Sequence, residues 1–278
     1  MLALWPKKNY LLLSPSALVL LDVDGSPFSQ KILSEHRQEI ASKEDKESFE
    51  EIVRSLKNLI EEQRINIKRL HVVISNHYIR YAILPPTSHP LTQEEQKKRA
   101  ELYFDKIYGT DAENWFIAED TLRFNQPHLV GAMNKGFIEE LQKFTRARRI
   151  QVLTVEPILI PLLNLWEATS KTPNAWIVCL LHGLLTLIQV EQFQPVFITQ
   201  FSVEQPFSND TFNKLLKREM LKQGAYGKAT QINVFAPLHL HLSFDDYTGV
   251  VTRRLPLPIS SQQNQLNHAQ LLQKMGAL

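Results

Sequence analysis

The sequence is poor in the residue types on which small-molecule chemistry most often depends. Its 278 residues include nine glycines, about 3% against an average of about 7%. Phosphate-binding loops use glycine to bring backbone amides close to a ligand, so nucleotide chemistry is disfavoured from the outset. The single cysteine, Cys179, excludes an intramolecular disulfide. Its apolar neighbours predict a buried thiol rather than a nucleophile.

The sequence also lacks an excess of charge of either sign and a long apolar run. The chain has 31 basic and 29 acidic residues and a net charge of +2, which is too balanced to indicate nucleic acid or an anionic membrane. The most apolar segment, residues 175–188, is interrupted by polar residues and is shorter than the roughly 20 residues that a bilayer requires. No signal-peptide pattern is visible. We therefore expect a cytoplasmic protein with no nucleic-acid partner and no direct membrane insertion.

Three common catalytic or cofactor motifs are also absent. The sequence contains no Gly-x-x-x-x-Gly-Lys-Ser/Thr, no Gly-x-Gly-x-x-Gly and no Gly-x-Ser-x-Gly. A P-loop, a Rossmann cofactor loop and a serine-hydrolase elbow are therefore not supported.

Two segments of the chain show the same order of elements. Short apolar runs separated by turn residues predict, in each segment, a three-strand meander that is followed by a helix and a further strand. The first segment has strands at 10–13, 17–23 and 29–34, turns at Ser14-Pro15-Ser16 and Asp24-Gly25-Ser26-Pro27, a polar stretch at 35–47, a helix from Phe49 and a strand at 70–75. The second has strands at 176–181, 184–190 and 195–201, a turn at His182-Gly183, a helix at 210–222 and a strand at 231–235.

This repetition predicts a duplicated, mixed α/β fold. The polar stretch at 167–174 is the best candidate for a linker. We expect a first half over residues 1–166, with an inserted α+β subdomain at about 86–150, and a second half over residues 175–278.

One motif suggests catalysis. The apolar strand that ends in Asp22-Val-Asp24-Gly-Ser resembles the first motif of haloacid dehalogenase-type phosphohydrolases. In that hypothesis Asp22 is the nucleophile and Asp24 is the general acid/base, while the Ser75 hydroxyl binds the phosphate and the Asp245–Asp246 pair binds a magnesium ion. The alternative is an ordinary hairpin, because Asp-Gly between two apolar runs is a strong hairpin signal and a third strand follows at once. The phosphohydrolase stays open as a second function.

A metal site is not predicted. His239 and His241 alternate with leucines and so share one face of a strand. Without a cysteine or an acid at ligand spacing, exposed strand histidines are the expected interpretation.

The duplicated meander resembles the build of actin-like domains. Residues 70–85 (LHVVISNHYIRYAILP) are similar to the strand, polar turn, strand and Leu-Pro ending of degenerate members of that class. These members are the PilM-type pilus-assembly proteins and the cytoplasmic domain of the L-type (GspL) component of type II secretion. The segments 100–104 (AELYF) and 151–157 (QVLTVEP) are similar to parts of the same family's insert. The resemblance implies a duplicated actin-like, ribonuclease H-like fold with an inserted α+β subdomain.

The same resemblance implies a loss of catalysis. Active actin-like ATPases place an Asp-x-Gly turn in each meander, where amides hold phosphate and the aspartate organises magnesium. Here Ser14-Pro15-Ser16 and His182-Gly183 stand at those places, and proline has no N–H to offer. Ser14, Ser16, His182 and Gly183 would then mark a vestigial nucleotide cleft. We expect no cofactor, no metal and no catalytic residue.

The expected role is a scaffold of a type IV pilus or type II secretion assembly platform. Its partners would be inner-membrane platform proteins, whose tails it would bind on the cytoplasmic side, with the motor ATPase as a further candidate and a homodimer left open. An L-type component would continue into a membrane helix, whereas the chain ends in the polar segment 260–278. The membrane anchor is therefore expected to be a separate protein, unless the chain is a cytoplasmic fragment.

Overall fold

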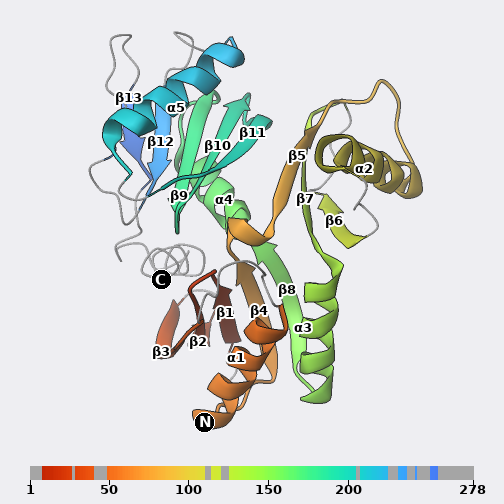
Figure 1. Cartoon of the computed structure of the whole chain (residues 1–278), viewed down its shortest axis with the longest axis vertical. Coiled ribbons are helices and arrows are strands. Elements are labelled where there is room, and N and C mark those ends of the chain that lie inside the picture. The colour runs from red at the N-terminus through yellow and green to blue at the C-terminus, as the bar shows by residue number, and fades with distance from the viewer. Residues whose placement is uncertain are drawn as a thin grey trace. The chain divides into compact units, whose positions relative to one another are not determined.

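The computed structural model describes residues 8–26, 29–40, 49–109, 114–119, 125–204, 207–224, 231–236, 242 and 251–255. Within them the chain forms helices and three sheets, so the predicted mixed α/β class is confirmed (Figure 1). Contacts divide the chain into two compact units. Unit 1 comprises Met1–Ile79, Met133–Leu165 and Leu257–Leu278, and unit 2 comprises Arg80–Ala132 and Trp166–Pro256.

Unit 1 is built on a five-stranded sheet of order β3-β2-β1-β4-β8. Its elements are β1 (Lys8–Leu13), β2 (Ala17–Ser26), β3 (Ser29–Glu39), α1 (Phe49–Glu62), β4 (Arg69–Ile74), the 3₁₀ turn η1 (Asn76–Tyr78), α3 (Lys135–Ala147) and β8 (Gln151–Pro157). The first three strands form an antiparallel meander, whereas β4 pairs parallel with β1 and with β8. The helices α1 and α3 contact each other, and α3 also contacts β8.

Unit 2 contains a second five-stranded sheet, of order β11-β10-β9-β12-β13. Its elements are β9 (Ala175–Leu181), β10 (Leu184–Glu191), β11 (Gln194–Ser202), α5 (Asn209–Lys222), β12 (Gln231–Phe235) and β13 (Val251–Arg254). Here too an antiparallel meander, β9 to β11, is followed by a helix and by a strand that pairs parallel with the first strand. The predicted duplication is confirmed by this shared strand order.

Unit 2 also holds the inserted α+β element. It consists of β5 (Arg80–Leu84), α2 (Gln93–Tyr108), β6 (Trp115–Glu119) and most of β7 (His128–Asn134), with the sheet order β5-β7-β6. Helix α2 begins with a capping box, in which Thr92 Oγ1 accepts from the Glu95 amide at 3.3 Å and a Glu95 carboxylate oxygen accepts from the Thr92 amide at 2.7 Å. The helix ends at Gly109, whose φ of 87° suits glycine. Strand β5 contacts β11.

The contact-based units divide the chain differently from the predicted halves. The predicted insert at about 86–150 includes α3, whereas α3 packs on α1 in unit 1. Helix α4 (Leu159–Thr169) carries the chain from unit 1 into unit 2. The boundaries of the two halves, 1–166 and 175–278, stay a prediction.

Two local predictions in the first meander are wrong. The turn expected at Asp24–Pro27 is strand as far as Ser26, and the ladder between β2 and β3 continues to the pair Ser26 and Ser29. The third strand, predicted to end at Ser34, continues through the polar residues as far as Glu39. The reason is that β3 is an edge strand with only one half-buried face, so alternating polar residues suit it as well as apolar ones do.

The expected linker at 167–174 is also partly wrong. Helix α4 continues to Thr169, and Trp166 within it is buried. Beyond the helix, Thr172 Oγ1 donates to Gln231 Oε1 at 2.6 Å. The composition of this stretch indicated a loop, and the structure adds a hydrogen bond that ties it to β12.

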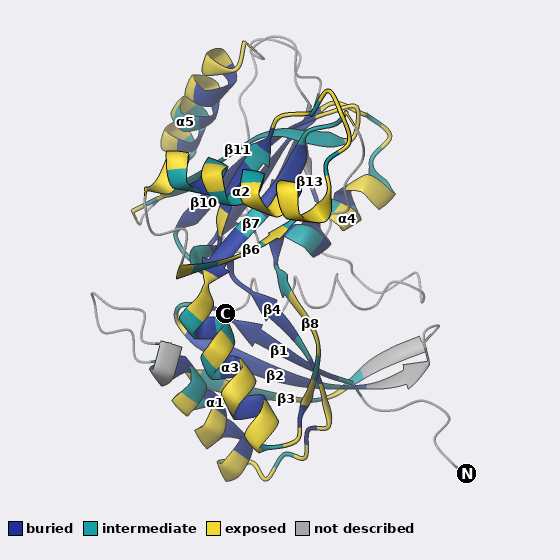
Figure 2. Ribbon diagram, turned by 90° about the vertical axis from the view of Figure 1, so that its right-hand side faces the viewer, coloured by how far each residue is buried: buried dark blue, intermediate teal, exposed yellow. Residues whose placement is uncertain are grey.

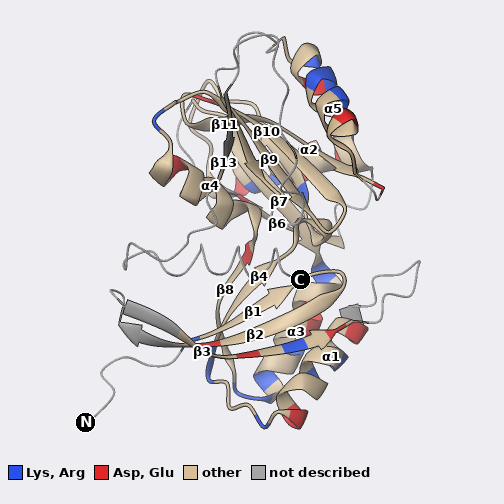
Figure 3. Cartoon of the chain, turned by 90° about the vertical axis from the view of Figure 1, so that its left-hand side faces the viewer, with Lys and Arg blue, Asp and Glu red and all other residues tan. Residues whose placement is uncertain are grey.

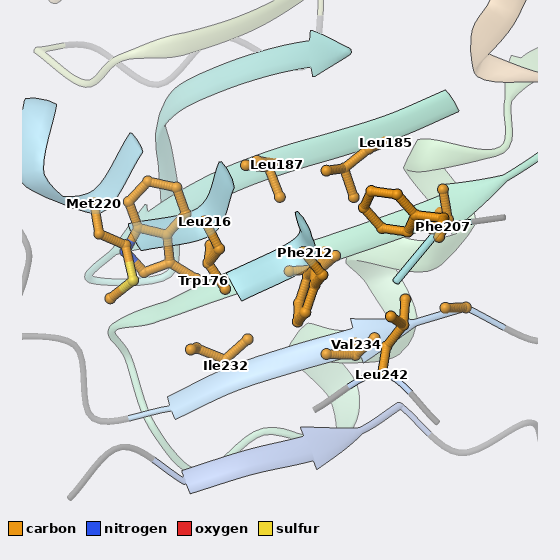
Figure 4. Packing of buried hydrophobic residues seen from close by; sticks show 13 residues of the cluster. Trp176, Leu185, Leu187, Phe207, Phe212, Leu216, Met220, Ile232, Val234 and Leu242 are labelled. Atoms are coloured by element: carbon orange, nitrogen blue, oxygen red, sulfur yellow. The ribbon is translucent and has the colours of Figure 1, made fainter. Parts of the chain in front are cut away.

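The core of the second sheet lies between the strands and α5 (Figure 4). It is built from alternate residues of each strand and from one face of the helix, because the side-chain period is two in a strand and 3.6 in a helix. Its buried members are Trp176, Val178, Leu180, Leu185, Leu187, Phe207, Phe212, Leu216, Met220, Ile232, Val234, Ala236 and Leu242. Phe212 projects from α5 into the middle of this cluster.

In the part of the chain that the structure describes, no helix combines the length and the apolar character that crossing a bilayer demands.

Two substitutions on α5 test which face of this helix packs against the second sheet. Phe212→Ala is expected to lower the free energy of unfolding by about 3–5 kcal/mol, because a fully buried ring is replaced by a cavity. Leu221→Ala removes a side chain that is 56% exposed and is expected to change it by less than about 0.5 kcal/mol. Urea unfolding followed by tryptophan fluorescence measures both, and equal effects would contradict the assigned faces.

Candidate functional site

The turn between β1 and β2 is closed by its own serine. The Ser14 hydroxyl is fully buried and donates to the Ala17 carbonyl at 2.9 Å, while it accepts from the Ala17 amide at 3.1 Å. The Ser14 amide donates to the same Ala17 carbonyl at 2.9 Å. Ser16 is exposed, and its carbonyl accepts from the Ile40 amide at 2.8 Å. The turn is therefore held by hydrogen bonds among residues 14–17 and to the end of β3.

The hydrogen bonds that close the turn use backbone N–H groups that a bound phosphate would need. A phosphate site requires several backbone N–H groups that point at one place. The amides of Ser14 and Ala17 both donate within the turn, and Pro15 has no N–H. Ser16 supplies the one remaining N–H of the four residues. A single amide is a poor phosphate ligand, because a phosphate site uses several convergent N–H groups.

The segment after β4 fixes this turn from the other side. The Ser75 amide donates to the Leu13 carbonyl at 2.8 Å, and the Tyr78 hydroxyl donates to the Ser14 carbonyl at 3.1 Å. The Tyr78 ring stacks parallel to Phe137 of α3, with 6.3 Å between the centroids. Ser75 Oγ lies 3.0 Å from His77 Nδ1, so its hydroxyl is engaged locally. These contacts make the end of β1 a rigid part of unit 1.

The corresponding turn in unit 2 is a two-residue hairpin. His182 and Gly183 both have positive φ, 52° and 78°, which is the conformation of a type I′ turn. The Gly183 carbonyl accepts from the Val203 amide at 2.7 Å. A Cβ at Gly183 would lie 3.3 Å from the Val203 carbonyl oxygen. Glycine is needed here for the turn itself and for the close approach of the chain after β11.

The four residues predicted for a vestigial cleft thus lie in two turns, one in each unit. The structure explains Ser14 and Gly183 as residues that close their turns. Their assignment, with Ser16 and His182, to a vestigial nucleotide cleft stays a prediction.

Asp22 is a structural carboxylate in the first meander. It faces Asn9 on β1 and Ser34 on β3 in the strand register. Asn9 Nδ2 donates to one carboxylate oxygen at 2.5 Å, and Ser34 Oγ donates to the other at 2.6 Å. The three side chains form a ladder across β1, β2 and β3, and Asn9 in it is buried.

This geometry does not fit the phosphohydrolase hypothesis. A nucleophilic aspartate of that kind would stand at the carboxyl end of a parallel sheet. Strand β2 instead continues past Asp22 to Ser26 and is antiparallel to both of its neighbours. The backbone of Asp24 pairs with Lys31 in the same ladder.

The remaining candidate ligands lie outside the described residues. These are Asp245, Asp246, His239 and His241. Among the residues that the structure does describe, no group of three or more histidine, cysteine or acidic side chains is placed to hold a metal ion.

Cys179 is a core residue, as its surroundings predict. It is buried in β9, and burial raises the pKa of its thiol to about 12. The thiol is therefore protonated at neutral pH, and reactivity requires the thiolate.

A second row of interacting polar side chains, which the sequence did not predict, runs from β1 across β4 to β8. His71 of β4 stacks on Tyr10 of β1, with the ring centroids 4.8 Å apart, and its Nδ1 lies 2.9 Å from Thr154 Oγ1 of β8. His71 is half-buried. Burial, and to a lesser extent the positive charge of Lys8, lowers the pKa of its imidazole.

Comparison with known proteins identifies the fold. No protein-family model matches the chain, and no curated protein matches it. A chain of a PilM–PilN type IV pilus biogenesis complex is 12% identical, with a TM-score of 0.62 and coverage of 98% of this chain and 95% of that chain. The cytoplasmic domain of EpsL, an inner-membrane component of the type II secretion system of Vibrio cholerae, is 10% identical, with a TM-score of 0.58 and coverage of 98% and 95%. A protein from Bacteroides thetaiotaomicron with an actin-like ATPase fold and unknown function is 14% identical, with a TM-score of 0.57 and coverage of 83% and 82%.

This chain has the actin-like fold. The predicted resemblance to PilM-type proteins and to the cytoplasmic domain of L-type secretion components is confirmed by the two matches that span nearly the whole of both chains. At 10–14% identity the similarity establishes the fold.

The structural role of Asp22 can be measured. Asp22→Ala leaves the side-chain donors of Asn9 and Ser34 without their acceptor, and the free energy of unfolding is expected to fall by about 1–3 kcal/mol. The control is Glu39→Ala at an exposed position of β3, for which a change of less than about 0.5 kcal/mol is expected. Chemical denaturation measures both. A stable Asp22→Ala variant that has lost a phosphatase activity of the wild type would instead support catalysis.

The row of side chains around His71 predicts a pH dependence of stability. The folded-state pKa of His71 is lowered, whereas the unfolded chain has a pKa of about 6.5. The unfolded state therefore binds a proton first as the pH falls, and stability is lost from about pH 7 downward toward the folded-state pKa. His71→Gln is expected to flatten this part of the pH profile of urea unfolding. An unchanged profile would show that His71 does not contribute.

Proposed function

We propose that this chain is a non-catalytic, actin-like scaffold on the cytoplasmic side of an inner-membrane assembly platform of a type IV pilus or type II secretion machine. The fold similarity to PilM in its complex with PilN, and to the cytoplasmic domain of EpsL, supports a role in such an assembly.

The observation that carries the non-catalytic part is the closed β1–β2 turn. The Ser14 amide and hydroxyl both donate to the Ala17 carbonyl, and the Ala17 amide donates to the Ser14 hydroxyl, so these groups are used within the turn. In an actin-like protein that turn is where phosphate would bind, and here it has neither an acid for magnesium nor a set of amides for phosphate. This turn therefore supports a scaffold whose action does not depend on nucleotide hydrolysis.

The proposed partners are the tails of platform membrane proteins. The similar chain comes from a PilM–PilN type IV pilus biogenesis complex, and we extend that kind of partnership to this chain. The chain would then reach the membrane through its partners. A scaffold of this kind binds its partner with an affinity that does not depend on nucleotide.

A binding titration tests this proposal. Fluorescent peptides with the sequences of the cytoplasmic tails of the inner-membrane platform proteins are titrated with the full chain, and anisotropy is measured with and without ATP and magnesium. One tail is expected to bind saturably, with the same dissociation constant in both conditions. A peptide of the same composition in scrambled order is the control.

Two results would count against the proposal. The first is the absence of saturable binding for every tail. The second is binding that needs ATP, because a nucleotide-dependent affinity requires the site that the Ser14 turn lacks.

A further inference from the structure

The two edges of the sheet in unit 1 differ in character. Strand β3 forms one edge, and Figure 3 shows that charged residues of both signs occur along it. Charged residues of this kind, Glu35, Arg37 and Glu39, are a common protection of an edge strand against pairing with another chain. The opposite edge is β8.

Strand β8 lacks such protection along most of its length. Residues 151–155, Gln-Val-Leu-Thr-Val, contain no charge, and among the described residues β8 pairs only with β4. Leu153 and Val155 are 39% and 36% exposed. Figure 2 shows exposed and half-buried residues along β8 beside the buried β1, β2 and β4. An uncharged, partly exposed edge strand with apolar residues is a surface on which a further strand can add.

The ends of β8 carry opposite charges. At its amino end lie two exposed arginines, Arg149 before the strand and Arg69, which is paired with Gln151 in the register of β4 and β8. Near its carboxyl end lies Glu156. A strand with one cationic end, one acidic end and an apolar middle is complementary to a second copy of itself in the antiparallel direction.

Local geometry limits how far such pairing can extend. A bulge lies between Val152 and Thr154 on β8, and Pro157 at its end has no N–H to donate. The backbone available for pairing is therefore short and is centred near Thr154, an exposed β-branched residue that suits a strand.

We propose that β8 pairs antiparallel with β8 of a second copy of this chain, about a two-fold axis at Thr154. Leu153 of one copy then lies opposite Val155 of the other, and the arginines of each copy approach Glu156 of the other. The interface is isologous, because the same surface is used on both copies. The two sheets join edge to edge into one sheet. This inference rests on β8 alone and is independent of the scaffold proposal.

The first test is the mass of the full chain in solution. Sedimentation equilibrium over a wide range of concentration is expected to show a monomer–dimer equilibrium. Val155→Lys puts a charge opposite Leu153 of the other copy and two like charges diagonally across the two-fold axis, so it is expected to raise the dimer dissociation constant about tenfold or more. Leu33→Lys is the matched control, because Leu33 is 48% exposed on the opposite edge, β3, and its dissociation constant should equal that of the wild type. Thermal melts of both variants establish that each is folded.

The second test reads the register directly. Residues that face each other in antiparallel strands have Cα atoms about 4.5–5.5 Å apart, within the range that a disulfide spans. Thr154→Cys is therefore expected to form a covalent dimer under mild oxidation. Leu33→Cys should stay monomeric on a denaturing gel. The natural Cys179 is buried and gives no background.

Either of two outcomes overturns the proposal. One is a wild-type chain that is monomeric at every concentration. The other is a dimer that Val155→Lys leaves unchanged and that Thr154→Cys does not crosslink, since such a dimer uses another surface.

Discussion

The position of β1 and β9 at the centre of their sheets constrains the rest of the structure. Each is the first strand of an antiparallel meander and also pairs parallel with the strand that returns after the helix. Both edges of each strand are therefore used, and both faces are covered: Leu11, Leu12 and Leu13 are at most 1% exposed, and all seven residues of β9 are buried. A strand enclosed in this way has no room for chemistry along its length. The turn that follows each of these strands is where an actin-like ATPase would bind phosphate.

What stands in that turn decides which activities the fold can support. An actin-like ATPase would need an acid and free amides there. This chain has Ser14, whose side chain and backbone hydrogen bonds close the turn, and Pro15, which has no amide hydrogen. Tyr78 and Ser75 then tie the closed turn to the end of β4. The same hydrogen bonds that close the turn also hold the end of β1 in place.

Local signals in the sequence predicted the elements well. The Thr92 and Glu95 capping box, the His182–Gly183 turn and the repeated strand spacing depend on residues that are close in sequence, and all three are present in the structure. What could not be predicted depends on register between distant strands. Asp22 looked like a catalytic acid because its partners, Asn9 and Ser34, are 13 and 12 residues away. The stacking of His71 on Tyr10 and the pairing of β3 to Glu39 depend on the same long-range alignment.

The central claim is that an actin-like chain with a closed β1–β2 turn has lost nucleotide binding. Calorimetric titration of the purified full chain with ATP in the presence of magnesium tests it most directly. The expected result is heat no greater than that of dilution at every ATP concentration. Saturable binding of ATP at one site per chain would contradict the claim, because it would show that amides other than those of the Ser14 turn hold the phosphates.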